Sequence, residues 1–333
     1  MKATQFDLEV NGTRLGGRSW LPDAQDTPDG RARAALVIVH GVAEHGGRYA
    51  AFATAAAEQG IAVFAVDHRG HGLTAGTVAR AGHVADRGGW QLIVDDLRAV
   101  VRHVRFRHPD VPVVLLGHSM GSLVARELVT QPPLLVDGMV LIGPPGHPGA
   151  KAAGTVLASA IVRTRGAEHR SKLLDRLTFA GHNAAFSPAR TDRDWLSGVP
   201  EQVDSYLADE WCGFVCSASF MRDLARAAVR VNSPENAAST PHDLPILLLA
   251  GSDDPVSNSG VAAQRAAVAY EAAGVKRVEV NIYPGGRHEL LNDVMAAEVT
   301  HDILAFVDTL AFDDNPEPGT GTSTGTGTGT ATD

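Results

Sequence analysis

Apolar residues along the chain gather in short runs that are bounded by turn-forming residues. The runs without polar residues lie at 35–39, 61–66, 111–116, 139–142 and 246–250. A strand without polar residues is buried on both faces, so these runs predict the central strands of a covered sheet. Apolar residues recur at helical spacing over 49–59, 90–106 and 122–129. Strands and helices therefore alternate, which predicts an α/β fold, with a mostly parallel sheet and helices on both of its faces.

The two ends of the chain depart from this alternation. Residues 4–20 alternate between polar and apolar positions around Asn11-Gly12. This pattern predicts an antiparallel hairpin at an edge of the sheet. Residues 313–333 are rich in Gly and Thr. Such a composition cannot bury apolar surface, so we expect a disordered tail.

A long insert interrupts the strand pattern between 145 and 241, where the sequence becomes helical and rich in aromatic residues. We therefore expect an α/β core domain formed by 1–144 and 242–312, with 145–241 as a helical cap. The aromatic residues of the insert include Phe179, Phe186, Trp195, Tyr206, Trp211, Phe214 and Phe220. Two interpretations of these rings stay open: they line an apolar pocket over the sheet, or they form a small core of the insert itself.

Composition excludes several classes of function. The 333-residue chain is 44% hydrophobic, enough for a large core, and its net charge of −9 argues against nucleic acid as the main partner. The spacing of Cys212 and Cys216 fits neither a C-x-x-C redox site nor a zinc site, so we expect free thiols. The first residues lack the apolar segment of a signal peptide, and no apolar run reaches membrane-spanning length. We therefore expect a cytoplasmic protein without a transmembrane segment.

A Gly-x-Ser-x-Gly pattern follows the third apolar run directly and leads into a helical segment. It places Ser119 between Gly117 and Gly121. A serine on so tight a strand-to-helix turn adopts a strained backbone, and glycines beside it let the strand and the helix approach closely. Ser119 is therefore a candidate nucleophile. The same pattern at 321–325 has no strand before it and no helix after it, so it carries no weight.

A serine hydroxyl needs an imidazole to take its proton and a carboxylate to orient that imidazole. Asp253 and Asp254 follow the strand predicted at 246–250, and His288 follows the strand predicted at 278–283. The chain order Ser, Asp, His is the order of α/β-hydrolases. From position alone both carboxylates are candidates, and a helix N-cap is the more ordinary role for Asp253.

An oxyanion hole needs two N–H donors directed at the developing charge. One comes from the residue after the nucleophile, which is Met120, and the other from a loop after an earlier central strand, where Val42 fits. Backbone donors leave the side chain free to vary. Chemistry of this kind requires no cofactor and no metal.

Several motifs together resemble the monoacylglycerol lipase and lysophospholipase branch of the α/β-hydrolases, which is similar to the S33 serine aminopeptidases. The segments that carry the resemblance are His40–Tyr49, Asp67–Gly72, Gly117–Gly121, Gly251–Val256 and Gly285–Glu289. The resemblance spans most of residues 5–310. It implies Ser119 as nucleophile, Asp254 as acid, His288 as base, and Val42 and Met120 as oxyanion donors. Asp253 is the nearest competitor for the acid.

Other polar residues near these motifs have structural interpretations. We expect Glu44, Asp67 and Arg69 to brace the loops through charged hydrogen bonds. His68 and His71 lack a third ligand at useful spacing, which disfavours a metal site. The Gly-x-Gly-x-x-Ala pattern at 70–75 is not followed by a strand-borne acid about twenty residues later, so we do not expect a nucleotide site.

These features together predict a serine ester hydrolase. A cap over the site admits one acyl chain more readily than three, which favours a monoacylglycerol or lysophospholipid substrate and leaves transient membrane contact through the cap open. Alternatives on the same fold are an aminopeptidase, a thioesterase and a cofactor-free haloperoxidase. Dehalogenases and epoxide hydrolases are disfavoured because they carry Asp in place of Ser119. A non-catalytic binding module is disfavoured because no triad member is missing. The oligomeric state stays open.

Overall fold

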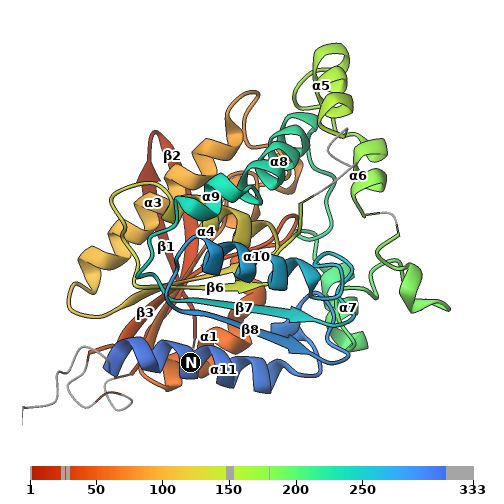
Figure 1. Ribbon diagram of the computed structural model, residues 1–333. Helices are drawn as coiled ribbons and strands as arrows, with labels where there is room; N and C mark the ends of the chain where they lie inside the picture. Colours follow the sequence, from red (N-terminus) through yellow and green to blue (C-terminus); the bar gives the residue numbers. More distant parts are fainter. Residues whose placement is uncertain (1, 24–26, 28–30, 148–153, 180, 313–333) are drawn as a thin grey trace, which may run out of the picture.

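The computed structural model describes residues 2–23, 27, 31–147, 154–179 and 181–312. Eight strands form one sheet in the order β1-β2-β4-β3-β5-β6-β7-β8 (Figure 1). The strands are β1 (Thr4–Val10), β2 (Thr13–Trp20), β3 (Ala34–Val39), β4 (Ile61–Val66), β5 (Val113–His118), β6 (Gly138–Ile142), β7 (Ile246–Gly251) and β8 (Val278–Tyr283). β3 to β8 pair in parallel, whereas β1 and β2 are antiparallel. The predicted mostly parallel sheet and its edge hairpin are confirmed.

The hairpin turn follows from its two central residues. Asn11 has φ +48° and Gly12 has φ +73°. Positive φ at both central positions gives the turn type that matches the twist of antiparallel strands, and the Asn-Gly pair tolerates it best.

The third predicted strand differs in its bounds, because it begins at Val113 and runs on to His118. Gly117 and His118 continue the ladder by pairing with Val39 and Ile142. An isolated glycine in an apolar run ordinarily weakens a strand, which is why the pattern alone ends the strand too early. Here the close approach of the following helix requires the glycine.

Helices cover both faces of the sheet, as predicted. The helices outside the 145–241 segment are α1 (Ala50–Glu58), α2 (Gly72–Ala75), α3 (Gly89–Arg107), α4 (Met120–Val129), α10 (Val261–Ala272) and α11 (Ala296–Phe312), and short 3-10 turns lie at η2 (Gly46–Tyr49), η3 (Val78–Arg80) and η6 (Leu290–Asn292). β3 shows how the two cores form: Val37 packs with α3 and α4 on one face, whereas Leu36 and Ile38 pack with α1 and α11 on the other. Each such fully buried side chain contributes about 1.5–3 kcal/mol.

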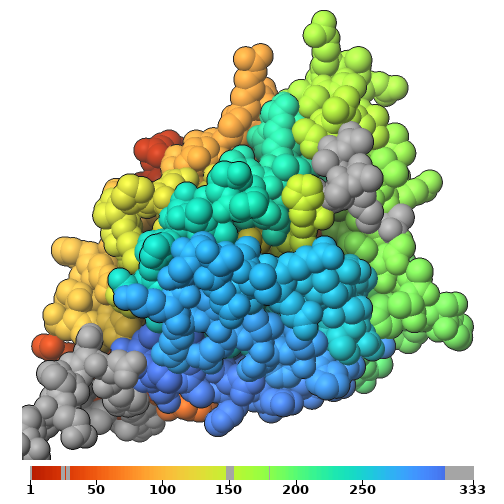
Figure 2. All heavy atoms as spheres, in the orientation of Figure 1, coloured from red at the N-terminus to blue at the C-terminus, as the bar shows by residue number. Residues whose placement is uncertain are grey.

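The segment 145–241, called the cap segment below, connects β6 to β7. It contains α5 (Gly154–Arg165), α6 (Lys172–Phe179), η5 (Ala184–Phe186), α7 (Pro200–Ala208), α8 (Ala218–Val231) and α9 (Pro234–Ala238). Figure 1 shows α7 beyond the arrowheads of β7 and β8, with α5 and α6 on the same side of the molecule. Figure 2 shows the part of the cap segment with α5 and α6 in green along this side. α8 packs into the core beside α3 and α4, so the cap segment is anchored on the sheet domain.

The division into core and cap stays a prediction, and the predicted tail at 313–333 lies outside the described residues. Within the described part of the chain, no helix is both long and apolar enough to cross a membrane.

Candidate active site

Ser119 lies on the sharp turn between β5 and α4, where its backbone has φ +51° and ψ −117°. Few non-glycine residues adopt such angles, and the cost persists only where the surroundings hold the residue in place. A Cβ atom at Gly121 would lie 1.8 Å from the Val39 carbonyl oxygen, and one at Gly117 would lie 2.6 Å from the Gly121 carbonyl oxygen. The Ser119 N–H donates to the Ile142 carbonyl at 2.9 Å. The predicted strained turn with close-packed glycines is thus confirmed.

Asp254 and His288 meet at the carboxyl ends of β7 and β8. The His288 Nδ1 atom lies 3.0 Å from Asp254 Oδ1, and both side chains are buried. The Val256 N–H also donates to Asp254 Oδ1, at 2.8 Å. Burial raises the pKa of the Asp254 carboxyl, but the charge and hydrogen bond of His288 outweigh burial and hold this pKa below its ordinary value. A charged Asp254 orients the imidazole with its proton on Nδ1, which leaves Nε2 free to accept one.

Asp253, the competing carboxylate, faces solvent and accepts a hydrogen bond from the Ser252 hydroxyl at 3.0 Å. Its expected role as a helix N-cap is wrong, because the next helix, α10, begins only after its N-cap Gly260. A run of turns separates β7 from α10. These turns allow the Asp254 side chain to point toward the protein interior.

The structure brings Ser119 and His288 to the same cavity, which both of them line. The ring of His118, the residue before Ser119, lies 4.7 Å from the ring of His288. Gly143, at the end of β6, has φ +53°, and a Cβ atom there would lie 3.0 Å from His288 Nδ1. The end of β6 therefore leaves space for the Asp254–His288 pair.

Val42 and Met120 both line this cavity as well. Met120 is the first residue of α4, where backbone N–H groups lack intrahelical partners. Among the described residues, no group accepts a hydrogen bond from the Val42 N–H. Two free donors at one cavity beside Ser119 have the composition that an oxyanion hole needs. Their catalytic role stays a prediction, like that of the triad.

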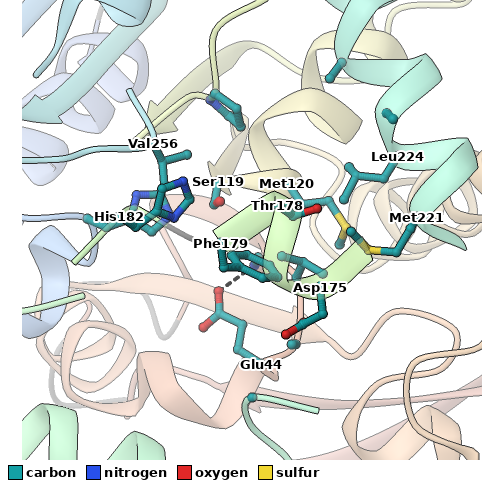
Figure 3. A pocket seen from close by; sticks show the side chains of 18 of the residues that line it. Glu44, Ser119, Met120, Asp175, Thr178, Phe179, His182, Met221, Leu224 and Val256 are labelled. Carbon is teal, nitrogen blue, oxygen red and sulfur yellow. Dashed lines mark hydrogen bonds between the residues drawn. The ribbon is translucent and has the colours of Figure 1, made fainter. Parts of the chain in front are cut away.

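The cavity has a volume of about 670 Å³. Figure 3 shows Ser119 at its wall, with Met120 from α4 and both Met221 and Leu224 from α8. Its aromatic lining consists of Phe179, Trp195, Tyr206 and Phe214. Trp195 and Tyr206 also belong to a small apolar cluster of the cap segment, whereas Phe220 is buried in the main core. Both interpretations of the aromatic residues thus hold, each for part of the set.

The polar loops around the site are braced as expected. Asp67 accepts hydrogen bonds from the N–H groups of Gly46 and Leu73, each at 2.7 Å. Arg69 binds Asp96 with two nitrogens, at 2.6 and 2.8 Å. These bonds tie the loop after β4 to the 3-10 turn at 46–49 and to α3.

The sequence predicts that Glu44 braces a loop, but it does not reveal the hydrogen-bond partners of Glu44. Glu44 accepts hydrogen bonds from the Tyr49 hydroxyl and from His118 Nδ1, both at 2.9 Å. Burial raises the pKa of Glu44, but His118 and Arg48 outweigh burial and hold this pKa well below its usual range. Arg48 also binds Glu289 through both guanidinium ends. The signal that was available is position: His118 and Glu289 are the immediate neighbours of Ser119 and His288 in the sequence.

Two groups of side chains within the described residues combine three potential metal ligands. They are His45 with Asp209 and Cys212, and His83 with Asp86 and Glu168. His45 Nδ1 accepts the Gly47 N–H at 3.1 Å, so Nε2 carries the proton and donates to Asp209. That tautomer opposes a metal ion at Nε2. In the second group both carboxylates are exposed.

His68, His71 and both cysteines have other surroundings. His68 and His71 are buried and pack with His40, and burial lowers the pKa of His68 to about 3. Cys212 and Cys216 are free thiols, as predicted, and burial raises the pKa of both.

One protein family and several known proteins are similar to this chain over most of its length. The family model described as serine aminopeptidase, S33, matches residues 30–295. The monoacylglycerol lipase of Mycolicibacterium smegmatis is 29% identical over 305 residues, covering 90% of this chain and 94% of that protein. The monoglyceride lipase of Mus musculus is 31% identical over 301 residues, covering 89% of this chain and 86% of that protein. A solved structure, a highly thermostable carboxyl esterase from Bacillus coagulans in complex with glycerol, shares the fold with a TM-score of 0.85 at 24% identity, covering 93% of this chain and 99% of that one.

Proposed function

The chain belongs to the serine aminopeptidase S33 family, within the monoacylglycerol lipase branch of the α/β-hydrolases, and we propose that it cleaves monoacylglycerols or lysophospholipids through an acyl-enzyme on Ser119. Membership makes it an enzyme of the serine ester hydrolase type. The observation that carries the proposal is the buried Asp254–His288 pair, of which His288 lines the same cavity as the strained Ser119.

In the proposed mechanism, His288 Nε2 takes the Ser119 hydroxyl proton while the Ser119 oxygen attacks the ester carbonyl carbon. The N–H groups of Val42 and Met120 stabilise the oxyanion of the tetrahedral intermediate. His288 then gives the proton to the departing alcohol. A water molecule, deprotonated by His288, attacks the acyl-enzyme and releases the fatty acid, which restores Ser119.

The cavity lining supports an amphipathic substrate with one acyl chain. Apolar side chains from α4, α5 and α8 line much of it, including Leu123, Leu157 and Leu224. Asp175 and Arg193 add charged groups that can hydrogen-bond to the hydroxyls of a glycerol or to a head group. A volume of about 670 Å³ suits one drug-sized ligand.

Aminopeptidase activity is the second candidate, because the Asp175 carboxylate lines the cavity and an acid there can bind the α-amino group of a substrate. A panel of monoacylglycerols, lysophosphatidylcholine and aminoacyl anilides separates the two. We expect hydrolysis of the esters and none of the anilides. Faster anilide hydrolysis that Asp175→Asn abolishes would establish the peptidase instead.

The nucleophile is tested by Ser119→Ala. We expect the loss of fluorophosphonate labelling and a drop in turnover of about 10⁴-fold or more. Ser239→Ala, the same change at an exposed serine that follows α9, is the control and keeps both. The carboxylates offer a second matched pair, in which Asp254→Asn loses turnover and the exposed neighbour Asp253→Asn keeps it. Undiminished ester hydrolysis by Ser119→Ala contradicts the proposal.

A cytoplasmic location and transient contact of the cap segment with a membrane surface also belong to the proposal. Co-sedimentation of the protein with phospholipid vesicles tests the contact, and the absence of any vesicle-bound fraction counts against it.

A further inference from the structure

His118 occupies a buried position between two hydrogen-bond acceptors. Its Nδ1 lies 2.9 Å from Glu44 Oε1, and its Nε2 lies 3.3 Å from the His288 carbonyl oxygen. A carbonyl oxygen accepts only, so Nε2 carries a proton. Glu44 Oε1 also accepts from the Gly41 N–H at 2.5 Å and from the Tyr49 hydroxyl at 2.9 Å. Because this oxygen accepts from both of these donors, it carries no proton of its own, and His118 Nδ1 therefore donates to it as well.

His118 is therefore an imidazolium, which is protonated on both ring nitrogens and carries one positive charge. It lies directly before Ser119 in the chain and is only 5% exposed. One ring nitrogen holds the loop that carries His288. The other holds Glu44, which in turn fixes the Gly41 N–H beside Val42. A single charged side chain thus connects the nucleophile, the base and the loop at 40–45, which carries the Val42 N–H and is called the oxyanion loop below.

We propose that the His118 imidazolium, paired with Glu44, is a positioning group that holds His288 and the oxyanion loop in register with Ser119. The proposal rests on the proposed function above, because it concerns the same serine and the same base. His118 does not touch the substrate in this scheme. It acts through the backbone of His288 and through Glu44.

The charges around His118 come from two loops. The loop after β3 and the 3-10 turn contribute Glu44, Arg48 and the Tyr49 ring, whose centroid lies 6.3 Å from that of His118. The loop after β8 contributes His288 and Glu289. Arg48 binds Glu289 through both guanidinium ends, so these two charges match each other. Glu44 is left as the counter-ion of His118.

The pH dependence follows from this pairing. Burial lowers the pKa of His118, but the hydrogen bond and charge of Glu44 outweigh burial and raise this pKa above 6.5, the ordinary value. The charged form is therefore complete below the ordinary pKa and is lost as the pH rises through the raised one. When His118 loses one proton, either Glu44 or the His288 carbonyl loses the hydrogen bond that His118 donates to it. We expect kcat to fall on the alkaline side for this reason.

The test compares pH profiles of kcat and KM on a water-soluble ester for four proteins. They are the wild type, His118→Asn, Glu44→Gln and the double variant with both substitutions. In His118→Asn the new amide can still donate to Glu44 but cannot titrate. We expect kcat of His118→Asn to fall about 10- to 100-fold with KM within about threefold, and its profile to lose the alkaline decline. The double variant should lose little beyond the worse single one, because both changes break one pair.

The control is His68→Asn, which removes another buried imidazole that is uncharged, given its pKa of about 3. It should keep the alkaline decline of kcat. Fluorophosphonate labelling separates this proposal from the first one: His118→Asn still labels at Ser119, only more slowly, whereas Ser119→Ala does not label. If His118→Asn fails to fold, ¹⁵N spectra of histidine-labelled wild type give the answer, since they show directly whether both His118 nitrogens are protonated.

Three results overturn the proposal. The first is a wild-type kcat and pH profile in a folded His118→Asn variant. The second is additive loss in the double variant. The third is a neutral His118 ring at neutral pH in the ¹⁵N spectra.

Discussion

Two regions of the molecule face the same cavity but are held in place by different forces. At the carboxyl ends of the strands, buried charged groups have directional partners, as in the pairs Asp254 with His288 and Glu44 with His118. The cap segment presents mainly apolar side chains to the cavity. Several of its large apolar residues remain exposed, among them Val156 at 73% and Leu173 at 53%.

This contrast indicates in which region the enzyme tolerates substitutions. Hydrogen bonds require particular distances and angles, and a backbone contact shorter than about 3 Å leaves no space for a larger residue. A small displacement of these groups therefore costs free energy of folding. Apolar contacts depend on buried area and on volume, and they tolerate swaps that preserve both. We infer that the strand ends determine whether the reaction proceeds and that the cap segment determines which acyl chain enters.

The largest effect is expected at Gly121, and the same glycine-to-alanine change can be made in the cap segment for comparison. Gly121→Ala places a Cβ atom 1.8 Å from the Val39 carbonyl oxygen, so α4 must move away from β3 and carry the Met120 N–H with it. We expect the free energy of unfolding to fall by about 3 kcal/mol or more, with loss of esterase activity. Urea unfolding and ester hydrolysis measure the two effects.

Gly154→Ala in α5 is the matched change in the cap segment. Among the described residues, a Cβ atom there meets no atom within 4 Å apart from its chain neighbours and the backbone of its own helix. Because alanine favours a helix more than glycine does, the free energy of unfolding should change by less than about 1 kcal/mol. Equal destabilisation by the two alanines would remove the distinction between the regions.

The strand ends were predictable from the sequence because local pattern and chain order determine them. Ser119 and Asp254 each follow an apolar run, and His288 follows the alternating strand predicted at 278–283. In a parallel sheet the carboxyl ends of the strands share one edge, so residues far apart in the chain arrive at one place. The strained turn at Ser119 follows from the glycines on either side of it.

The rest required the three-dimensional structure. No local pattern says that Asp253 faces solvent while Asp254 turns inward, since that depends on how the turns between β7 and α10 pack. The pairing of His118 with Glu44 spans 74 residues, and that of Arg48 with Glu289 spans 241. The packing of the cap segment is harder to predict, because contacts between its apolar side chains depend on buried area and not on a local sequence pattern. Phe220 enters the main core while Phe214 lines the cavity, although the two lie close together in the chain.

An intermediate effect is expected from Leu224→Trp, which narrows the cavity from the α8 side. The larger ring occupies space that a long acyl chain needs, so kcat/KM for a long-chain monoacylglycerol should fall about tenfold. Hydrolysis of p-nitrophenyl acetate should stay within about twofold, because the strand ends are unchanged. A chain-length series of esters measures the ratio. Equal loss on short and long esters would show that the cap segment also controls the chemistry.

The smallest effect is expected at the contact that joins the two regions, where His45 Nε2 donates to Asp209 Oδ2 at 2.8 Å. Asp209→Asn keeps an acceptor but removes the charge of a partly exposed pair, so the free energy of unfolding should fall by less than about 1 kcal/mol. Burial raises the pKa of Asp209, but hydrogen bonds from His45 and from the Trp211 N–H outweigh burial and hold this pKa below 3.8.

The sign of the pH dependence at Asp209 follows from that depressed pKa. The carboxylate contributes its stability above the pKa of the unfolded chain, and the contribution disappears as the pH falls through the lower pKa of the folded protein. The difference in urea-unfolding free energy between wild type and Asp209→Asn should therefore be constant near neutral pH and shrink below about pH 4. A difference that stays constant on acidification would mean that the contact between the regions does not depend on the charge of Asp209. The link between the cap segment and the oxyanion loop would then be one of packing alone.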